Sequence, residues 1–224
     1  MNLGIRKEIF IFRHGETDWN KEGRFQGSID IPLNEAGRKQ AEDLIPQLAS
    51  CGIEAILSSN LTRAIQTAEI IAQQLKVPVF QDAGLREAHL GKAEGLMIHE
   101  IQAQFGTEIV SRWRSHHLTD ADISYPGGET GVQVMERAFQ ALQEFLLTNP
   151  FQRIGVASHG GVIRRVMQRI LPPGSDPVPI PNGVLYSLTF CTKSNDWRLF
   201  DFEKSLGSSE SQLRKEPSRL EQKQ

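Results

Sequence analysis

Short apolar runs that alternate with amphipathic segments are the feature that most constrains the fold of this chain. Residues 7–12 read KEIFIF and residues 153–157 read RIGVA, and both runs have the length of a buried strand rather than of a helix. Residues 55–59 form a third run of this kind. Strands that alternate with helices predict a mostly parallel sheet with helices on both faces.

The segments between these runs carry apolar residues at helical spacing. Helices are predicted from residue 34, capped by Asn34, to about residue 50; from 60 to 75; from a cap at Glu129 or Thr130 to about 147; and from 161 to 171. Further strands are predicted at 77–80, 184–190 and 197–202, and a turn at 194–195 makes the last two a candidate antiparallel hairpin. The predicted architecture is a three-layer α/β/α fold.

Two stretches depart from the alternation. Residues 95–128 are helical in part and rich in histidine, arginine and tryptophan, and we interpret them as a small helical cap inserted into the domain. Residues 204–224 are dominated by Ser, Glu, Lys, Gln and Arg, and their few leucines form no apolar face, so a disordered tail is predicted there. The expected organisation is one domain over residues 1–203.

Composition excludes several classes of partner. The 224 residues are 39% hydrophobic with a formal net charge of -2, so the chain can bury a core but has no positive field for nucleic acid or an anionic membrane surface. No apolar run approaches the length of a membrane span. The two cysteines match neither a disulfide scaffold nor a zinc pattern, so a cytoplasmic location is expected.

Basic and imidazole side chains stand where predicted strands end. Arg13 and His14 follow the first strand, His159 follows the strand at 153–157, and Arg63 follows the strand at 55–59. In an open α/β sheet, ligands bind beyond the carboxyl ends of the strands, so these side chains are expected to meet in one site. Several donors that converge in this way suit a phosphoryl group, and helices that begin there would add free N–H groups.

The order of these motifs resembles that of the histidine phosphatase superfamily, the phosphoglycerate mutase-like fold, over most of the chain. The resemblance rests on the segments Arg13-His14-Gly15-Glu16-Thr17-Asp18-Trp19-Asn20, Gly23-Arg24-Phe25-Gln26-Gly27, Ser58-Ser59-Asn60-Leu61-Thr62-Arg63-Ala64, Leu85-Arg86-Glu87, Pro126-Gly127-Gly128-Glu129-Thr130 and Ser158-His159-Gly160-Gly161. It implies that His14 is a nucleophile that becomes a phosphohistidine, that Glu87 donates a proton to the leaving group, and that His159 stabilises charge on the transferred group. Arg13 and Arg63 complete the expected catalytic set.

Other residues are expected to contact the substrate. Candidates for substrate binding are Asn20, Gln26, Gly27, Thr17 and Gly160. Thr17 has a second interpretation, because Glu16, Thr17 and Asp18 also form a helix-capping pattern. Glu94, Glu100 and Asp82 compete with Glu87 for the acid role. No cofactor or metal is expected, since the histidines of the cap region show no ligand spacing.

The flanking segments favour hydrolysis over phosphoryl transfer between substrates. Around the acidic residue, the mutases of this family have a segment similar to Leu-Asn-Glu-Arg-His-Tyr-Gly. This chain has Leu85-Arg86-Glu87-Ala88-His89-Leu90-Gly91 at the same place. They also carry an adjacent arginine pair in the insertion, and here Trp113 separates Arg112 from Arg114. Gly161 stands where the mutases usually have asparagine. We therefore predict a metal-independent phosphatase, with mutase activity as the first alternative.

Several questions stay open at this level. A protein that binds phosphate without turnover is the alternative of a different class, although the joint presence of the five expected catalytic residues argues against it. The small phosphorylated substrate is not identified, because the cap residues Arg112, Trp113, Arg114, His116 and His117 form no recognised motif. A homodimer is compatible with the sequence but is not required by it.

Overall fold

A mixed sheet forms the centre of the molecule. The structure is a computed structural model that describes residues 5–199. Within this part of the chain, six strands pair in the order β3-β2-β4-β1-β5-β6. Their bounds are β1 (Arg6–Arg13), β2 (Ala55–Ser59), β3 (Val79–Asp82), β4 (Arg153–Ser158), β5 (Leu185–Cys191) and β6 (Asp196–Leu199).

The strand directions agree with the sequence-based expectation. The strands β3, β2, β4 and β1 are parallel to one another, and β5 and β6 are antiparallel to their neighbours. Asn195, in the turn between β5 and β6, has a φ of 55°, which a short hairpin turn requires and asparagine tolerates. The predicted closing hairpin is therefore confirmed as far as residue 199; its remainder and the predicted tail at 204–224 lie outside the described residues.

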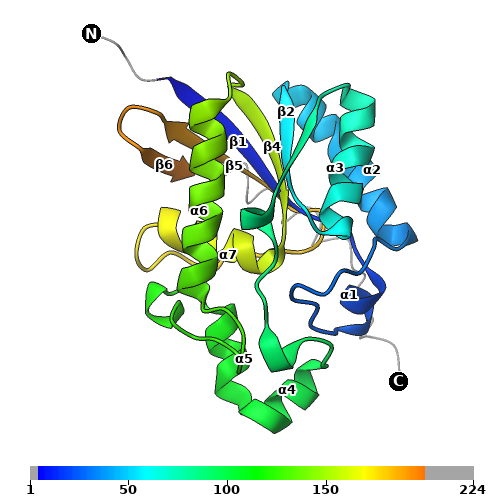
Figure 1. Ribbon diagram of the computed structural model, residues 1–224, viewed down its shortest axis with the longest axis vertical. Helices are drawn as coiled ribbons and strands as arrows, with labels where there is room; N and C mark the ends of the chain where they lie inside the picture. Colours follow the sequence, from blue (N-terminus) through cyan, green and yellow to red (C-terminus); the bar gives the residue numbers. More distant parts are fainter. Residues whose placement is uncertain (1–4, 200–224) are drawn as a thin grey trace, which may run out of the picture.

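Helices cover both faces of the sheet, which confirms the three-layer α/β/α fold (Figure 1). Phe10 and Phe12 point to the face covered by α2 (Glu35–Cys51) and α3 (Thr62–Leu75). Ile9 and Ile11 point to the opposite face, where they join the core with α6 (Gly131–Thr148) and α7 (Gly160–Ile170). A strand that is apolar on both faces must lie between two layers, which explains the uninterrupted apolar run at residues 9–12.

The cap lies beyond the carboxyl ends of the parallel strands, at the same end as α1 (Asp18–Glu22) (Figure 1). It contains α4 (Ile98–Phe105), α5 (Thr107–Arg114) and a short turn of 3₁₀ helix at Leu118–Asp120, as expected for 95–128. Arg165 of α7 is fully buried, donates to the Trp113 carbonyl at 3.0 Å and places its guanidinium 4.7 Å from the Trp113 ring. This contact fastens the cap to the layer beneath it.

Two elements begin two residues later than predicted, each for a local reason. Helix α3 begins at Thr62 rather than at residue 60, because its N-cap, Leu61, has no capping side chain and Asp30 accepts from the Thr62 N–H instead, at 2.7 Å. Strand β3 begins at Val79 rather than at residue 77, because Pro78 has no N–H to donate, although its carbonyl accepts from Ile56 at 2.9 Å. No helix within residues 5–199 is long and apolar enough to cross a membrane.

Candidate active site

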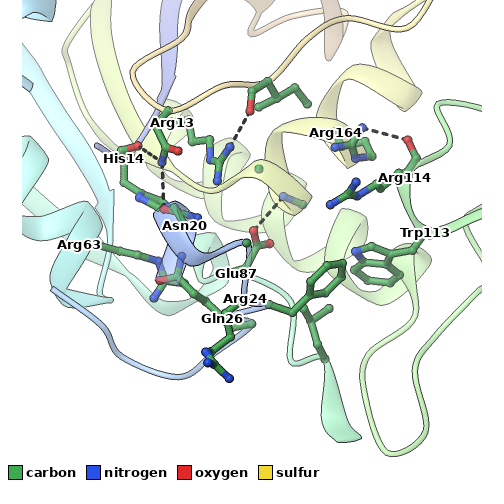
Figure 2. A pocket seen from close by; sticks show the side chains of 18 of the residues that line it. Arg13, His14, Asn20, Arg24, Gln26, Arg63, Glu87, Trp113, Arg114 and Arg164 are labelled. Atoms are coloured by element: carbon green, nitrogen blue, oxygen red, sulfur yellow. Dashed lines mark hydrogen bonds between the residues drawn. The ribbon is translucent and has the colours of Figure 1, made fainter. Parts of the chain in front are cut away.

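A cavity of about 430 Å³ opens between the carboxyl ends of the central strands and the cap. Figure 2 shows the side chains that converge on it from strand ends, helix starts and cap. Most of the residues singled out from the sequence line this cavity: Arg13, His14, Asn20, Gln26, Gly27, Arg63, Glu87 and Gly160. The fold thus brings together residues that are up to 147 positions apart in the sequence, Arg13 and Gly160 being the extremes.

His14 is held as a neutral imidazole with one free nitrogen. Its side chain is 2% exposed, and its Nδ1 lies 2.7 Å from the Gly15 carbonyl oxygen, so Nδ1 carries the proton and donates it. Burial, followed by the charges of Arg63 and Arg13, lowers the pKa of His14 well below its ordinary value of 6.5. Nε2 has no hydrogen-bond partner in the described part of the chain, so its lone pair is available to an electrophile.

The loop after His14 is locked in place by close backbone packing. A Cβ on Gly15 would lie 2.1 Å from the Gly37 carbonyl oxygen, so only glycine fits at position 15. The Gly15 N–H donates to Thr67 Oγ1 at 3.1 Å, and Asn182 donates to the His14 carbonyl at 3.0 Å. These contacts preorganise the imidazole, because neither the strand before it nor the loop after it can shift freely.

Two arginines flank His14, of which Arg63 is buried and Arg13 is partly buried. Arg13 donates through Nη1 to the Ile180 carbonyl at 2.8 Å, and its buried Nε has no partner in the described residues. Arg63 donates through Nη1 and Nη2 to the carbonyls of Ile29 and Gly27, both at 2.8 Å. Burial is the main cause that lowers the pKa of each arginine to about 10, and both remain cationic at neutral pH. The two guanidinium groups therefore make the floor of the cavity strongly attractive to an anion.

His159 lies beside His14 but does not line the cavity. The two ring centroids are 5.1 Å apart, and His159 is fully buried. Its Nδ1 accepts from Arg63 Nε at 3.2 Å, which leaves the proton on Nε2, 2.8 Å from Ser59 Oγ. Both ring nitrogens thus have protein partners in this structure. The direct contact with a transferred group that the sequence resemblance implies would require one of these hydrogen bonds to be exchanged.

Glu87 faces the start of α7. Its Oε2 accepts from the Gly161 N–H at 2.9 Å, and its Oε1 accepts from the Ala88 N–H at 2.9 Å. A Cβ on Gly161 would lie 2.3 Å from Glu87 Oε1, so the glycine leaves the space that the carboxylate occupies. The electrostatic attraction of Glu87 raises the pKa of Arg13 and Arg63, which places its charge within reach of both.

The three acidic residues that competed with Glu87 have structural partners instead. Glu94 accepts from the Ser28 and Leu90 N–H groups, at 2.8 and 3.0 Å. Glu100 caps α4 by accepting from the Met97 N–H at 2.7 Å, and Asp82 accepts from the Gly84 N–H at 2.7 Å. None of the three lines the cavity, so Glu87 is the acid candidate that the structure brings to the site.

The predicted substrate-binding residues divide into two groups. Gln26 is 7% exposed and its Oε1 has no hydrogen-bond partner in the described residues, and Asn20 also lines the cavity. Thr17, in contrast, is fully buried and caps α1: its Oγ1 accepts from the Asn20 N–H at 3.2 Å. Of the two interpretations of Thr17, the structure supports the capping one, and Thr17 does not line the cavity.

Sequence reasoning missed several cavity residues. Asn182 comes from the loop before β5 and bridges His14 and Asn20, a contact that no local pattern signals. Arg164 was detectable in principle, because it stands four residues after Gly160 and so lies on the same helix face. From the cap, Trp113 and Arg114 line the cavity, whereas Arg112, His116 and His117 do not. Across residues 5–199, no group of three or more His, Cys, Asp or Glu side chains could hold a metal ion.

Known proteins are similar to this chain in sequence and in fold. Residues 9–202 match the histidine phosphatase superfamily (branch 1). The chain is 39% identical over 199 residues to phosphoglycerate mutase-like protein 4 of Arabidopsis thaliana, a match that covers 88% of this chain and 81% of that protein. It is 38% identical over 174 residues to the metal-independent phosphoserine phosphatase of Arabidopsis thaliana, a match that covers 75% of this chain and 70% of that protein. A mycobacterial glucosyl-3-phosphoglycerate phosphatase, solved in complex with VO3, superposes with a TM-score of 0.75 at 29% identity over 87% of this chain and 97% of that one.

Proposed function

Because this chain belongs to the histidine phosphatase superfamily, we propose that it is a metal-independent phosphatase that hydrolyses a small phosphomonoester through a phosphohistidine at His14. The observation that carries this proposal is the state of His14: a neutral ring whose Nδ1 is fixed by the Gly15 carbonyl at 2.7 Å and whose Nε2 is free. Arg13 and Arg63 beside it supply the charge that a phosphate dianion requires. The likeness to a metal-independent phosphoserine phosphatase supports the same reaction.

In the first step, His14 Nε2 forms a bond to phosphorus while the bond between phosphorus and the ester oxygen breaks. The electron pair of that bond goes to the leaving oxygen, which takes a proton from the Glu87 carboxyl group. Arg13 and Arg63 stabilise the charge that is spread over the phosphoryl oxygens. The Gly15 carbonyl holds the Nδ1 proton of the phosphorylated ring, so the phosphorus remains a good electrophile.

In the second step, the Glu87 carboxylate takes a proton from water as the water oxygen bonds to phosphorus. The bond between phosphorus and Nε2 breaks, and its electron pair returns to His14. Inorganic phosphate leaves, the Glu87 carboxyl group is restored, and the ring regains its starting tautomer. One side chain serves as acid and then as base, which typically contributes about 10²- to 10⁴-fold in rate.

Mutase activity is the alternative, and the relative named phosphoglycerate mutase-like protein 4 favours it. A mutase must keep the phosphohistidine away from water until a second substrate group accepts the phosphoryl group. The position of Gly161 supports hydrolysis instead, because the missing side chain leaves Glu87 next to the cavity and to any water that enters it.

The test is phosphate release from a panel of phosphomonoesters in the presence of EDTA. We expect release from the wild-type protein and none from His14→Ala, with an acid-labile phosphoryl group trapped on the wild-type protein after rapid quenching. Isomerisation of 3-phosphoglycerate without phosphate release would establish the mutase. Binding of phosphate or vanadate with no turnover of any ester would establish a non-catalytic phosphate-binding protein.

A further inference from the structure

The segment Pro126-Gly127-Gly128-Glu129-Thr130 contributes no residue to the lining of the cavity. Thr130 caps α6, and Glu129 forms an ion pair with Arg137 of the same helix, with 2.8 Å between Glu129 Oε1 and Arg137 Nε. The side chains of Glu129 and Arg137 are only 27% and 23% exposed. A largely buried ion pair loses hydration energy, so it needs further hydrogen bonds to be stable. The partners that supply these hydrogen bonds indicate what the pair does.

Arg137 holds the backbone that carries Glu87. Its Nη1 donates to the carbonyls of Gly84 and Arg86, both at 2.7 Å, and its Nη2 donates to the Glu87 carbonyl at 3.3 Å. Apart from a short 3₁₀ turn at Ala83–Leu85, this backbone belongs to no helix or strand, so its carbonyls need donors from elsewhere. One guanidinium group serves three of them.

Glu129 extends this contact to the residues that follow Glu87 in the chain. Its Oε1 accepts from Arg137 Nε at 2.8 Å, and its Oε2 accepts from Arg137 Nη2 at 2.9 Å and from the His89 N–H at 2.8 Å. The Glu129 N–H in turn donates to the His89 carbonyl at 2.8 Å. Burial opposes the charge of Glu129, but the hydrogen bonds from Arg137 and His89 outweigh it and lower the pKa of this carboxyl group. The carboxylate is therefore anionic at neutral pH and held at both oxygens.

Two glycines allow the close approach that these contacts need. A Cβ on Gly84 would lie 2.9 Å from the Arg137 carbonyl oxygen of α6, and a Cβ on Gly128 would lie 2.6 Å from the His89 carbonyl oxygen. A side chain at either position would push the segment that carries Glu87 away from its partners. The close packing leaves the backbone of this segment little room to move.

The direction of the Glu87 side chain depends on the same backbone. Its Oε1 accepts at 2.9 Å from the N–H of Ala88, which lies between two residues that the pair holds, and its Oε2 accepts at 2.9 Å from the Gly161 N–H. A shift of the segment would displace both the Cα of Glu87 and one of the two donors that orient its carboxylate.

We propose that Arg137 and Glu129 are positioning residues, which together hold the Glu87 carboxyl group where it protonates the leaving oxygen. The inference rests on the proposed function, in which Glu87 is the proton donor. Neither Arg137 nor Glu129 lines the cavity, so both act through Glu87 and not on the substrate. Proton transfer requires close contact, and a misplacement of about 1 Å can lower a rate by about 10²-fold.

The test compares two esters whose leaving groups differ in their need for a proton. Benzyl phosphate releases a basic alkoxide, whereas p-nitrophenyl phosphate, which also carries one ring, releases a stable phenolate. The kcat/KM values report the step in which the leaving group departs. The ratio of the two values, measured on one preparation, does not change when part of the protein is unfolded, so a loss of stability alone leaves it unaltered.

Arg137→Lys keeps the positive charge, but an ammonium group lacks the planar fork that serves Glu129 and three carbonyls at once. We expect this variant to lower kcat/KM for benzyl phosphate by about tenfold or more and kcat/KM for p-nitrophenyl phosphate by less than about threefold. Glu129→Gln keeps an acceptor for the His89 N–H but loses the ion pair, so it should change the ratio in the same direction by a smaller factor.

Two controls locate the effect at Glu87. In a Glu87→Gln background, Arg137→Lys should change the ratio no further, because the group that it positions has been removed. The matched control is Arg112→Lys, since Arg112 makes its ion pairs within the cap, with Asp120 at 3.0 Å and Asp122 at 3.1 Å. It should keep the wild-type ratio.

The other outcomes separate this inference from the proposed function. If Arg137→Lys lowered both kcat/KM values by the same factor, or changed their ratio equally with and without Glu87, Arg137 would support the fold alone and the inference would be wrong. Hydrolysis of p-nitrophenyl phosphate that depends on His14 would then leave the proposed phosphatase intact. Absence of phosphate release from either ester by the wild-type protein would overturn both proposals.

Discussion

The proton donated by Glu87 matters most when the leaving group is a poor one. An alkoxide needs a proton as it leaves, whereas p-nitrophenolate does not. We therefore expect Glu87→Gln to lower kcat/KM for an alkyl phosphate by about 10²-fold or more and to change kcat/KM for p-nitrophenyl phosphate much less. Its kcat for p-nitrophenyl phosphate should fall, because the second step also needs the carboxylate, so a burst of one nitrophenolate per enzyme molecule should precede slow turnover.

Gly161→Ala is the matched variant, because it keeps Glu87 but fills the space that the Glu87 carboxylate occupies. The added Cβ would lie 2.3 Å from Glu87 Oε1, so the carboxylate must move. The variant should reproduce the leaving-group dependence of Glu87→Gln. Equal losses for alkyl and aryl esters in both variants would mean that Glu87 acts on binding and not on proton transfer.

At the same scale, the position of a site residue could be predicted where it depends on neighbours along the chain, but not where it depends on distant contacts. Arg13 and His14 were predictable because they end a strand. Asn182 was not, because its contact with the His14 carbonyl joins residues 168 positions apart. The hydrogen bonds that engage both nitrogens of His159 were equally invisible, since they come from Arg63 and Ser59 on other elements.

At the scale of elements, α3 depends on a cap from outside the helix. Asp30 Oδ1 accepts from the Thr62 N–H and Asp30 Oδ2 from the Thr62 hydroxyl, both at 2.7 Å. Asp30→Ala should lower the free energy of unfolding by about 1 kcal/mol, the usual value of an N-cap, as measured by urea denaturation. Asp30→Asn should retain most of that stability, because asparagine also caps helices.

The control for this prediction is Asp43→Ala on α2. Asp43 pairs with Lys39 at 3.0 Å on the surface, and exposed pairs of this kind contribute little to stability. If the two alanine variants lost the same stability, the loss at Asp30 would reflect the removal of a surface charge and not of a cap.

The elements themselves were predictable because local sequence patterns indicate them. Examples are the apolar run at residues 9–12, which predicts a strand, and the N-caps Asn34 and Thr130, which begin α2 and α6. The start of α3 was not, because its capping residue lies 32 positions before the helix. The strand order could not be predicted from the sequence either, since β4 lies between β1 and β2 in the sheet although it follows both in the chain. Local patterns determine elements, and packing determines their ends and order.

At the scale of the whole molecule, two buried histidines make stability depend on pH. Burial lowers the pKa of His14 and of His159 well below 6.5, so both stay neutral in the folded protein. Below about pH 6.5 the unfolded chain binds protons that the folded protein does not. Stability is therefore complete above that pH and is lost as the pH falls toward the folded-state values, by up to about 1.4 kcal/mol per pH unit for each histidine.

Urea denaturation between pH 5 and pH 7.5 measures this dependence. His14→Asn should reduce the slope of unfolding free energy against pH by about one proton, because asparagine does not titrate. A slope in the variant equal to that of the wild-type protein would show that His14 is protonated in the folded state at these pH values. In that case its Nε2 would not be a free nucleophile.

The place at which the cap joins the fold separates two kinds of evolutionary change. The cap is inserted into the chain after β3, which is an edge strand, so the insertion interrupts no hydrogen bonds between the central strands. The residues proposed to break the ester bond, Arg13, His14, Arg63 and Glu87, follow β1, β2 and β3 in the chain and lie outside the cap. Descendants of one ancestor can therefore lengthen, shorten or replace the cap and acquire new substrates, while the reaction itself is inherited unchanged.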